Sequence, residues 1–339
     1  IDDWADGSKR SLSARVRLEK GSVHDLVVEY RQAGGDAVFG FGWRRPSEAG
    51  ADYAALTAEA KRADAVLLVT GNRKGFGAAR ENEANDRPSI DLLPQDDLGL
   101  RTLLGVNPRT VVLVQAGSPV AMPWLDRARA VLNLSFLGQE TGRAVADVLL
   151  GKREPAGRLC QTWPKRLADS PAHALGDYER EAAHYKEGLL VGYRWYDAKA
   201  IEPLFPFGYG LGYATFAFGE PKVSTWGERV IVRVPVINTG KRAGAAVVQL
   251  YVEPPTGGVV FRAPRQLAAF AKVRLAPGER GVAEMELGPR AFAWWDEALP
   301  GWRHEAGVFT LAIGKSSRDI VARVPVERDA WECAIPAKR

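Results

Sequence analysis

The stretch at residues 65–70, AVLLVT, decides the fold of the middle of the chain. Two later runs have the same apolar character, TVVLV at 110–114 and AVLNL at 130–134. A strand with one face in water alternates apolar and polar residues, whereas these runs are apolar on both faces. They therefore predict a parallel sheet that is covered on both of its faces.

Stretches with helical periodicity alternate with these runs, at 52–63, 96–106 and 141–150. Alternation of strand and helix is typical of an α/β domain. Ligand sites in such sheets lie outside the carboxyl ends of the strands. The loops after Thr70 and Val114 are therefore the first places to look for a functional site.

The two ends of the chain have a different pattern. Strand-like runs at 13–19, 25–30 and 38–43 predict the end of a β-sandwich. After Pro221, alternating apolar and polar residues predict about seven short strands, the count and spacing of an immunoglobulin-like sandwich.

These patterns together predict a multidomain protein of the α/β plus all-β class. We expect a partial β-sandwich at residues 1–47 and a mostly parallel α/β sandwich domain at 48–216. An immunoglobulin-like β-sandwich is expected at 217–330.

Composition narrows the classes of function. The chain has 339 residues, 46% of them hydrophobic, and a formal net charge of +5, which excludes a disordered chain or a coiled coil. No apolar run approaches the roughly 20 residues of a membrane-spanning helix, so we expect no membrane partner. Basic residues are spread along the chain with acids between them, so we expect no nucleic-acid partner.

The residues that commonly bind metals are scattered. The four histidines show no metal-ligand spacing, and Cys160 and Cys333 are far apart in the sequence. The sequence therefore predicts no metal site and no disulfide framework. The glycines of the stretch 208–212 predict a turn rather than a nucleotide-binding loop.

The loop after Thr70 is long, glycine-rich and densely charged, and it runs from Gly71 to Arg87. Long loops in compact domains are commonly functional. Glu81 and Glu83 are candidate proton donors in this loop. A solvated loop without a catalytic role is the alternative.

Motifs along the chain resemble the C-terminal portion of glycoside hydrolase family 3, the β-glucosidase family. The stretch RENEANDRPSIDLLP at 80–94 is similar to the family's acid/base loop. Further matching stretches are AGSPVAMPW at 116–124, LGQETGRAVADVLLG at 137–151, PAGRL at 155–159, YKEGLLVGYRWYD at 185–197 and PLFPFGYGL at 203–211. The end of the chain resembles the family's fibronectin type III-like domain, and the start resembles the protective-antigen-type β-sandwich that some members insert.

The resemblance implies an exo-acting retaining β-glucosidase. The first glutamate of the family's loop is the general acid/base, and this position corresponds to Glu81. Arg80 stands in place of the usual Trp, and Ala84 and Asn85 replace the usual Gly and aromatic residue. Glu83 is therefore kept as the alternative acid/base.

A catalytic acid must begin the reaction protonated, and a neighbouring cation would oppose this. We therefore expect Arg80 and Arg87 to point away from Glu81 or to pair elsewhere, Arg87 with Asp86.

The family's nucleophile is an aspartate in a Ser-Asp-Trp-like motif of an N-terminal barrel, and this chain has no such motif. We therefore expect the chain to be one piece of a larger enzyme. A barrel portion, on the same precursor or on a separate chain, would supply the nucleophile and the sugar pocket. The open sheet would then expose an apolar edge where its missing strands belong.

The implied substrate is a β-glucoside, with β-xylosides as the runner-up, and no cofactor is implied. A non-catalytic carbohydrate-binding or structural subunit is the alternative from another class of function. Homo-oligomerisation and the cellular compartment are left open.

Three tryptophans, Trp124, Trp163 and Trp195, are candidates for stacking on sugar rings, because flat apolar faces suit the C–H surfaces of a pyranose. Packing in the core or between domains is the favoured interpretation of each. Trp294 and Trp295 are interpreted as sandwich or interface packing.

Overall fold

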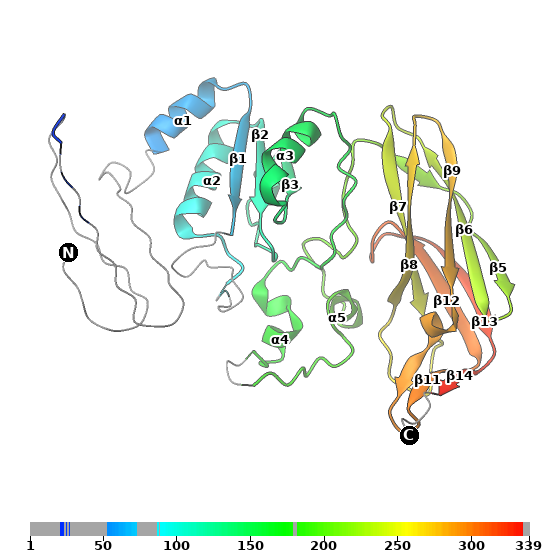
Figure 1. The fold of residues 1–339 in the computed structure, drawn as a ribbon. Coiled ribbons are helices and arrows are strands. Elements are labelled where there is room, and N and C mark those ends of the chain that lie inside the picture. Colours follow the sequence, from blue (N-terminus) through cyan, green and yellow to red (C-terminus); the bar gives the residue numbers. More distant parts are fainter. Residues whose placement is uncertain are drawn as a thin grey trace. The chain divides into compact units, whose positions relative to one another are not determined.

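The fold comes from a computed structural model that describes residues 21–23, 25, 27, 53–72, 87, 89–178 and 182–334 (Figure 1). The chain divides into two units, Ile1–Asp52 and Tyr53–Arg339. The strands expected at 13–19, 25–30 and 38–43 lie almost wholly outside the described residues, so the partial sandwich at 1–47 stays a prediction.

The first sheet of the second unit is parallel, as the sequence predicts. Its strands β1 (Val66–Gly71), β2 (Thr110–Gln115) and β3 (Ala130–Asn133) lie in the order β1-β2-β3, and all of them are parallel. The predicted helices are also present, as α1 (Tyr53–Arg62), α2 (Pro94–Val106) and α3 (Thr141–Leu149). The α/β prediction for this part of the chain is confirmed.

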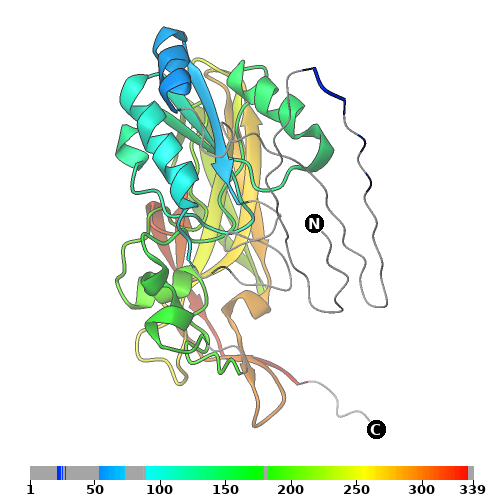
Figure 2. The ribbon, with the colours of Figure 1, turned by 90° about the vertical axis from the view of Figure 1, so that its left-hand side faces the viewer.

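Two helices pack on one side of this sheet and one helix on the other. α1 and α2 lie on one side, and α3 lies on the opposite side beside β3 (Figure 1, Figure 2). Asn107 follows α2 and is buried, and its side chain donates hydrogen bonds to the carbonyls of Ala60 at 2.8 Å and Ala63 at 3.0 Å. This amide therefore satisfies carbonyl groups at the end of α1 that the helix itself leaves free.

The core of the α/β part lies between α2, β2 and the loop that follows β2. Its buried members are Leu92, Leu100, Leu104, Val112, Val114, Ala116, Val120, Met122, Trp124 and Trp163. The sheet is not covered on both faces throughout, because Leu67 and Val69 of β1 are 58% and 64% exposed. β1 lies at the edge of the described sheet, with β2 between it and β3, so it has a neighbouring strand on one side alone in the part of the chain that is described.

The C-terminal half is a sandwich of two antiparallel sheets, as predicted. One sheet has the order β13-β12-β7-β8, and in the other β6 pairs with β4, β5 and β9. The strands are β4 (Phe216–Phe218), β5 (Lys222–Trp226), β6 (Arg229–Asn238), β7 (Gly244–Glu253), β8 (Gln266–Leu275), β9 (Arg280–Leu287), β12 (Gly307–Gly314) and β13 (Ile320–Arg328). Alternate residues of β6 are buried, and they meet β7, β9 and β12 in a single hydrophobic core.

A third small sheet was not expected from the sequence. It contains β10 (Trp294–Asp296), β11 (Gly301–His304) and β14 (Trp331–Ala334) in that order. Trp294 and Trp295 belong to this sheet, and the Trp295 ring meets the edge of the Trp302 ring with centroids 5.7 Å apart. These strands have only three or four residues, too few for an alternating pattern to identify them.

Several short helices lie between the larger elements of the unit. They are α4 (Pro171–Ala174), α5 (Tyr193–Ala198) and the 3₁₀ turns η2 (Leu125–Arg127), η3 (Gly138–Glu140), η4 (Leu167–Asp169) and η5 (Pro289–Phe292). Asp197 of α5 forms ion pairs with Arg318 at 2.6 Å and Arg265 at 3.5 Å, which attaches α5 to the sandwich. Burial raises the pKa of the Asp197 carboxyl, and the two arginines oppose that rise. None of the helices in the described ranges has the length and apolar content needed to cross a bilayer.

We predict that Asn238→Ala lowers the free energy of unfolding by about 2 kcal/mol. Asn238 is fully buried at the end of β6, where its amide donates to the carbonyls of Arg242 at 2.8 Å and Leu275 at 3.0 Å. Its side-chain oxygen accepts the Gly240 amide at 2.9 Å, so alanine leaves buried polar groups without partners. Urea unfolding checks this, with the exposed Thr225→Ala as the control. Equal stability of the two variants would contradict the prediction.

Candidate functional site

The two predicted proton donors, Glu81 and Glu83, lie in the segment 73–86, which is outside the described residues. Asn72 and Arg87 flank this segment, and both are described. The structure therefore shows how the candidate loop is attached to the sheet, and the assignment of Glu81 or Glu83 stays a prediction.

The loop leaves the sheet at a position that accepts only glycine. Gly71 is the last residue of β1, lies opposite Gln115 of β2, and has a φ of +132°. A Cβ atom at Gly71 would overlap the Gln115 carbonyl oxygen. The next residue, Asn72, donates its backbone N–H to that same carbonyl at 2.9 Å. Glycine at this exit therefore lets the chain stay close to β2 as it enters the loop.

Both flanks of the loop meet at one hydroxyl group. Ser118 lies in the loop after β2, and its Oγ accepts a hydrogen bond from Asn72 Nδ2 at 3.5 Å. The same Oγ accepts a second bond from Arg87 Nη1 at 3.2 Å. Ser118 therefore brings together the two ends of a segment that the sequence separates by 14 residues, from 73 to 86.

The Arg87 guanidinium also attaches to the surrounding backbone. Its Nη1 donates to the Pro119 carbonyl at 3.3 Å, and its Nη2 donates to the Asp91 carbonyl at 3.2 Å. Arg87 therefore has partners on the backbone of the loops around it, whereas its expected separation from Glu81 stays a prediction, because Glu81 lies outside the described residues. The expected pair with Asp86 and the position of Arg80 lie outside the described residues.

The segment after Arg87 is fixed to the same loop. Ser89 Oγ donates to the Asp91 carboxylate at 2.6 Å and accepts the Asp91 amide at 3.0 Å, which forms a tight local turn. The Ala121 amide then donates to the Ile90 carbonyl at 2.8 Å. The return path of the loop is therefore joined to the loop after β2 at more than one point.

A third loop reaches the same edge of the sheet after β3. Leu134 donates its amide to the Val114 carbonyl at 2.8 Å, and Ser135 has a φ of +50°. Phe136 and Leu137 follow and are 56% and 48% exposed. Sequence reasoning did not single out these two residues or Ser118, although all three lie within or beside the motif stretches at 116–124 and 137–151.

The three candidate tryptophans are core residues. Trp124 and Trp163 are each 1% exposed and belong to the core of the α/β part. Trp195 is 5% exposed, and its indole N–H donates to the Asp169 carbonyl at 3.2 Å. A sugar can stack only on an uncovered ring, so packing is the role that this structure shows for all three.

The described residues hold no group of three or more His, Cys, Asp or Glu side chains that could bind a metal ion. His173 shares a hydrogen bond of 3.0 Å with Ser170 Oγ and stacks on Tyr178. His304 is buried among aromatic rings, and burial lowers its pKa. Cys160 and Cys333 are exposed free thiols.

Comparison with known proteins matches most of the chain to the family that its sequence motifs resemble. A model described as "Glycosyl hydrolase family 3 C-terminal domain" matches residues 9–213. A second model, described as "Fibronectin type III-like domain", matches residues 246–317. The two matched ranges include the parallel sheet and most of the larger sandwich strands.

Curated relatives are named β-glucosidases. A beta-glucosidase of Rhizobium radiobacter is 41% identical over 345 residues, which covers 96% of this chain and 41% of the relative. Thermostable beta-glucosidase B of Acetivibrio thermocellus is 38% identical, covering 94% of this chain and 42% of the relative. The chain therefore spans about two fifths of the length of these relatives.

Solved structures show the same similarity. The GH3 beta-glucosidase of Bifidobacterium adolescentis matches with a TM-score of 0.77 and 37% identity, covering 84% of this chain and 42% of that one. The beta-glucosidase of Kluyveromyces marxianus in complex with glucose matches with a TM-score of 0.76 and 34% identity. That match covers 83% of this chain and 33% of the other.

We predict that Arg87→Ala lowers the free energy of unfolding by about 2 kcal/mol, because it removes the hydrogen bonds to Ser118, Pro119 and Asp91. Arg87→Lys keeps the charge but not the planar guanidinium, so its free energy of unfolding should fall by about half as much. Arg129→Ala is the control, since Arg129 is exposed and has no side-chain partner among the described residues. Chemical unfolding measures all three, and an Arg87→Ala variant as stable as the control would contradict this account.

Proposed function

Because the chain belongs to glycoside hydrolase family 3, we propose that it carries the acid/base part of a retaining β-glucosidase site. The reaction would release terminal β-linked glucose. The observation that carries the proposal is the attachment of both flanks of the segment 73–86 to Ser118, at the carboxyl edge of the parallel sheet. Support for the substrate comes from relatives that are named β-glucosidases.

The proposed general acid/base is Glu81, with Glu83 as the alternative. Retaining hydrolysis needs two carboxyl groups about 5–5.5 Å apart, one acting as nucleophile and the other as acid and then base. In the first step, Glu81 would donate its proton to the leaving oxygen while the nucleophile attacks the anomeric carbon. In the second step, the Glu81 carboxylate would take a proton from the water that releases the sugar.

This role requires the pKa of the acid to be higher than that of an ordinary glutamate. A negatively charged nucleophile nearby and partial burial would both raise it. Arg87 would act on the loop through its bonds to Ser118, Pro119 and Asp91 rather than as a proton-transfer group.

We further propose that a barrel portion supplies the nucleophile and most contacts to the cleaved sugar. This division of roles follows the family pattern, in which the nucleophile lies in a Ser-Asp-Trp-like motif that this chain lacks. The α/β domain at 48–216 would carry the acid loop, and the sandwich at 217–330 would support it. β-Xylosides are the runner-up substrates, since they differ from β-glucosides by one exocyclic group.

We predict that Glu81→Gln lowers kcat/KM on a nitrophenyl β-glucoside by 10²-fold or more, the usual size of an acid/base contribution. The assay uses the complete enzyme, with its barrel portion. The variant should also lose the alkaline limb of the pH profile, because glutamine has no proton to lose. Glu83→Gln is the matched control and should stay within about fivefold of the parent.

The control separates the two assignments. A large loss in Glu83→Gln with near-parent activity in Glu81→Gln would overturn the choice of Glu81. Full activity in both variants, or no hydrolysis by the complete enzyme, would favour the non-catalytic binding or structural subunit.

A further inference from the structure

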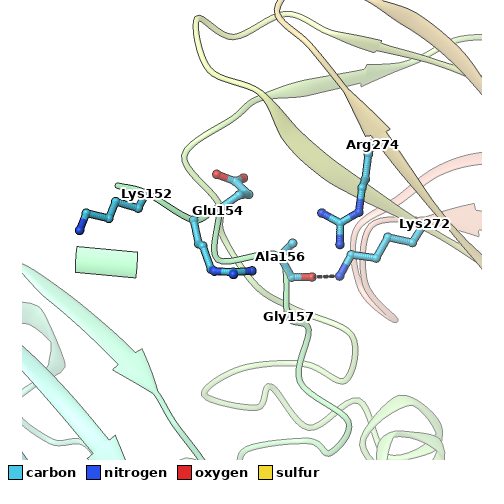
Figure 3. A pocket seen from close by; sticks show the side chains of 7 residues that line it. Lys152, Glu154, Ala156, Gly157, Lys272 and Arg274 are labelled. Atoms are coloured by element: carbon cyan, nitrogen blue, oxygen red, sulfur yellow. Dashed lines mark hydrogen bonds between the residues drawn. The ribbon is translucent and has the colours of Figure 1, made fainter. Parts of the chain in front are cut away.

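A pocket of about 390 Å³ lies where the segment after α3 meets strand β8 of the sandwich. Its lining includes Lys152, Arg153, Glu154, Ala156, Lys272 and Arg274 (Figure 3). Figure 3 shows Lys272 and Arg274 extending from the same strand towards the backbone of Ala156 and Gly157. Residues that are more than 100 positions apart in the sequence therefore form one basic pocket.

The walls of the pocket are held in place by hydrogen bonds between the two parts. Lys272 Nζ donates to the Ala156 carbonyl at 2.7 Å, and Arg242 Nη2 donates to the Gly151 carbonyl at 2.5 Å. Because both bonds end on the backbone of the segment 151–156, they fix this segment against the sandwich. The backbone that forms one wall of the pocket is therefore fixed against the strand that carries Lys272 and Arg274.

Positive charge exceeds negative charge in this pocket. The Glu154 carboxylate accepts the amides of Tyr213 at 3.0 Å and Ala214 at 3.2 Å, so both of its oxygens are used. Among the described residues, Lys152 and Arg274 have no ion-pair or hydrogen-bond partner for their side chains. Glu154 is thus the single acid in the lining, which has four cationic side chains, and one of these, Arg153, pairs with Asp147 at 3.3 Å.

The cations also act on one another. Partial burial lowers the pKa of the Lys272 ammonium, and the positive charges of Arg274 and Arg158 lower it further. Arg158 lies beside the pocket, and burial lowers its pKa too. Like charges that lie close together repel one another, and an anion bound between them would relieve that repulsion.

We propose that this pocket binds a doubly charged oxyanion, a phosphate or sulfate group, either free or carried on a small organic molecule. Lys272 has ammonium protons left after its bond to Ala156, and Arg274 offers a planar fork that suits two oxygens of one group. The volume lies in the range of small-molecule sites, about 300–1,000 Å³, so there is room for an organic part. The proposal does not depend on the glycosidase assignment.

The test is calorimetric titration of the full chain with inorganic phosphate at constant ionic strength and neutral pH. We expect saturable binding with a Kd at or below about 1 mM. The double variant Lys272→Gln/Arg274→Gln should weaken binding at least tenfold. Since Lys272 also bonds the Ala156 carbonyl, Arg274→Gln alone serves as a second variant that leaves this contact intact, and it should weaken binding at least threefold.

The matched control is Lys222→Gln/Arg280→Gln, which removes the same charges from exposed positions on β5 and β9 of the other sheet. Its affinity should stay within twofold of the parent. A second titration, with glucose 6-phosphate, distinguishes an organic phosphate from a free anion as the ligand. Tighter binding of glucose 6-phosphate than of phosphate would identify an organic phosphate, and equal binding would identify the free anion. Absence of saturation, or equal weakening in the pocket and control variants, would overturn the proposal.

Discussion

The parallel pairing of β1 with β2 is the constraint on which the candidate site depends. Parallel strands in register end at the same edge of a sheet, and here Gly71 lies directly opposite Gln115. The loops that follow the two strands must therefore start side by side. Ser118, on the second loop, is then close enough to bond both Asn72 and Arg87 on the first. Without this register, the two flanks of the segment 73–86 would have no common anchor.

The sequence predicted the regular elements well, because their signals are local. Runs that are apolar on both faces identified the parallel strands, and helical periodicity identified α1, α2 and α3. α2 ends before Asn107, whose buried side chain bonds carbonyls of α1 and accepts the Arg109 amide at the entry to β2. Pro108 has no N–H group and disfavours helical geometry at the residue before it, so the end of this helix has a local cause in the sequence.

Features that depend on distant residues were missed. β14 pairs with β11 across a separation of about 30 residues, and each strand is too short to carry a pattern of its own. The exposed face of β1 was also not predicted, because Leu67 and Val69 are as apolar as the partly buried Leu68. Apolar character shows that a strand can be buried on both faces, and the neighbours decide whether it is.

The site was only partly predictable for the same reason. The acid/base assignment of Glu81 rests on motif similarity, whereas Ser118 gains its role from the position of β2 beside β1. The basic pocket gives a stronger example, because basic residues that looked evenly spread in the sequence gather where β8 meets the segment after α3. The contacts that bring these parts together include the bonds from Lys272 to the Ala156 carbonyl and from Arg242 to the Gly151 carbonyl.

The central claim is that Glu81 transfers the proton in glycoside cleavage. Its most direct test is the product formed by Glu81→Ala, in the complete enzyme, from an activated aryl β-glucoside in the presence of azide. Azide needs no general base, so the account predicts that turnover recovers at least tenfold and that the product is β-glucosyl azide. Turnover that azide leaves unchanged, with glucose as the sole product, would contradict the claim.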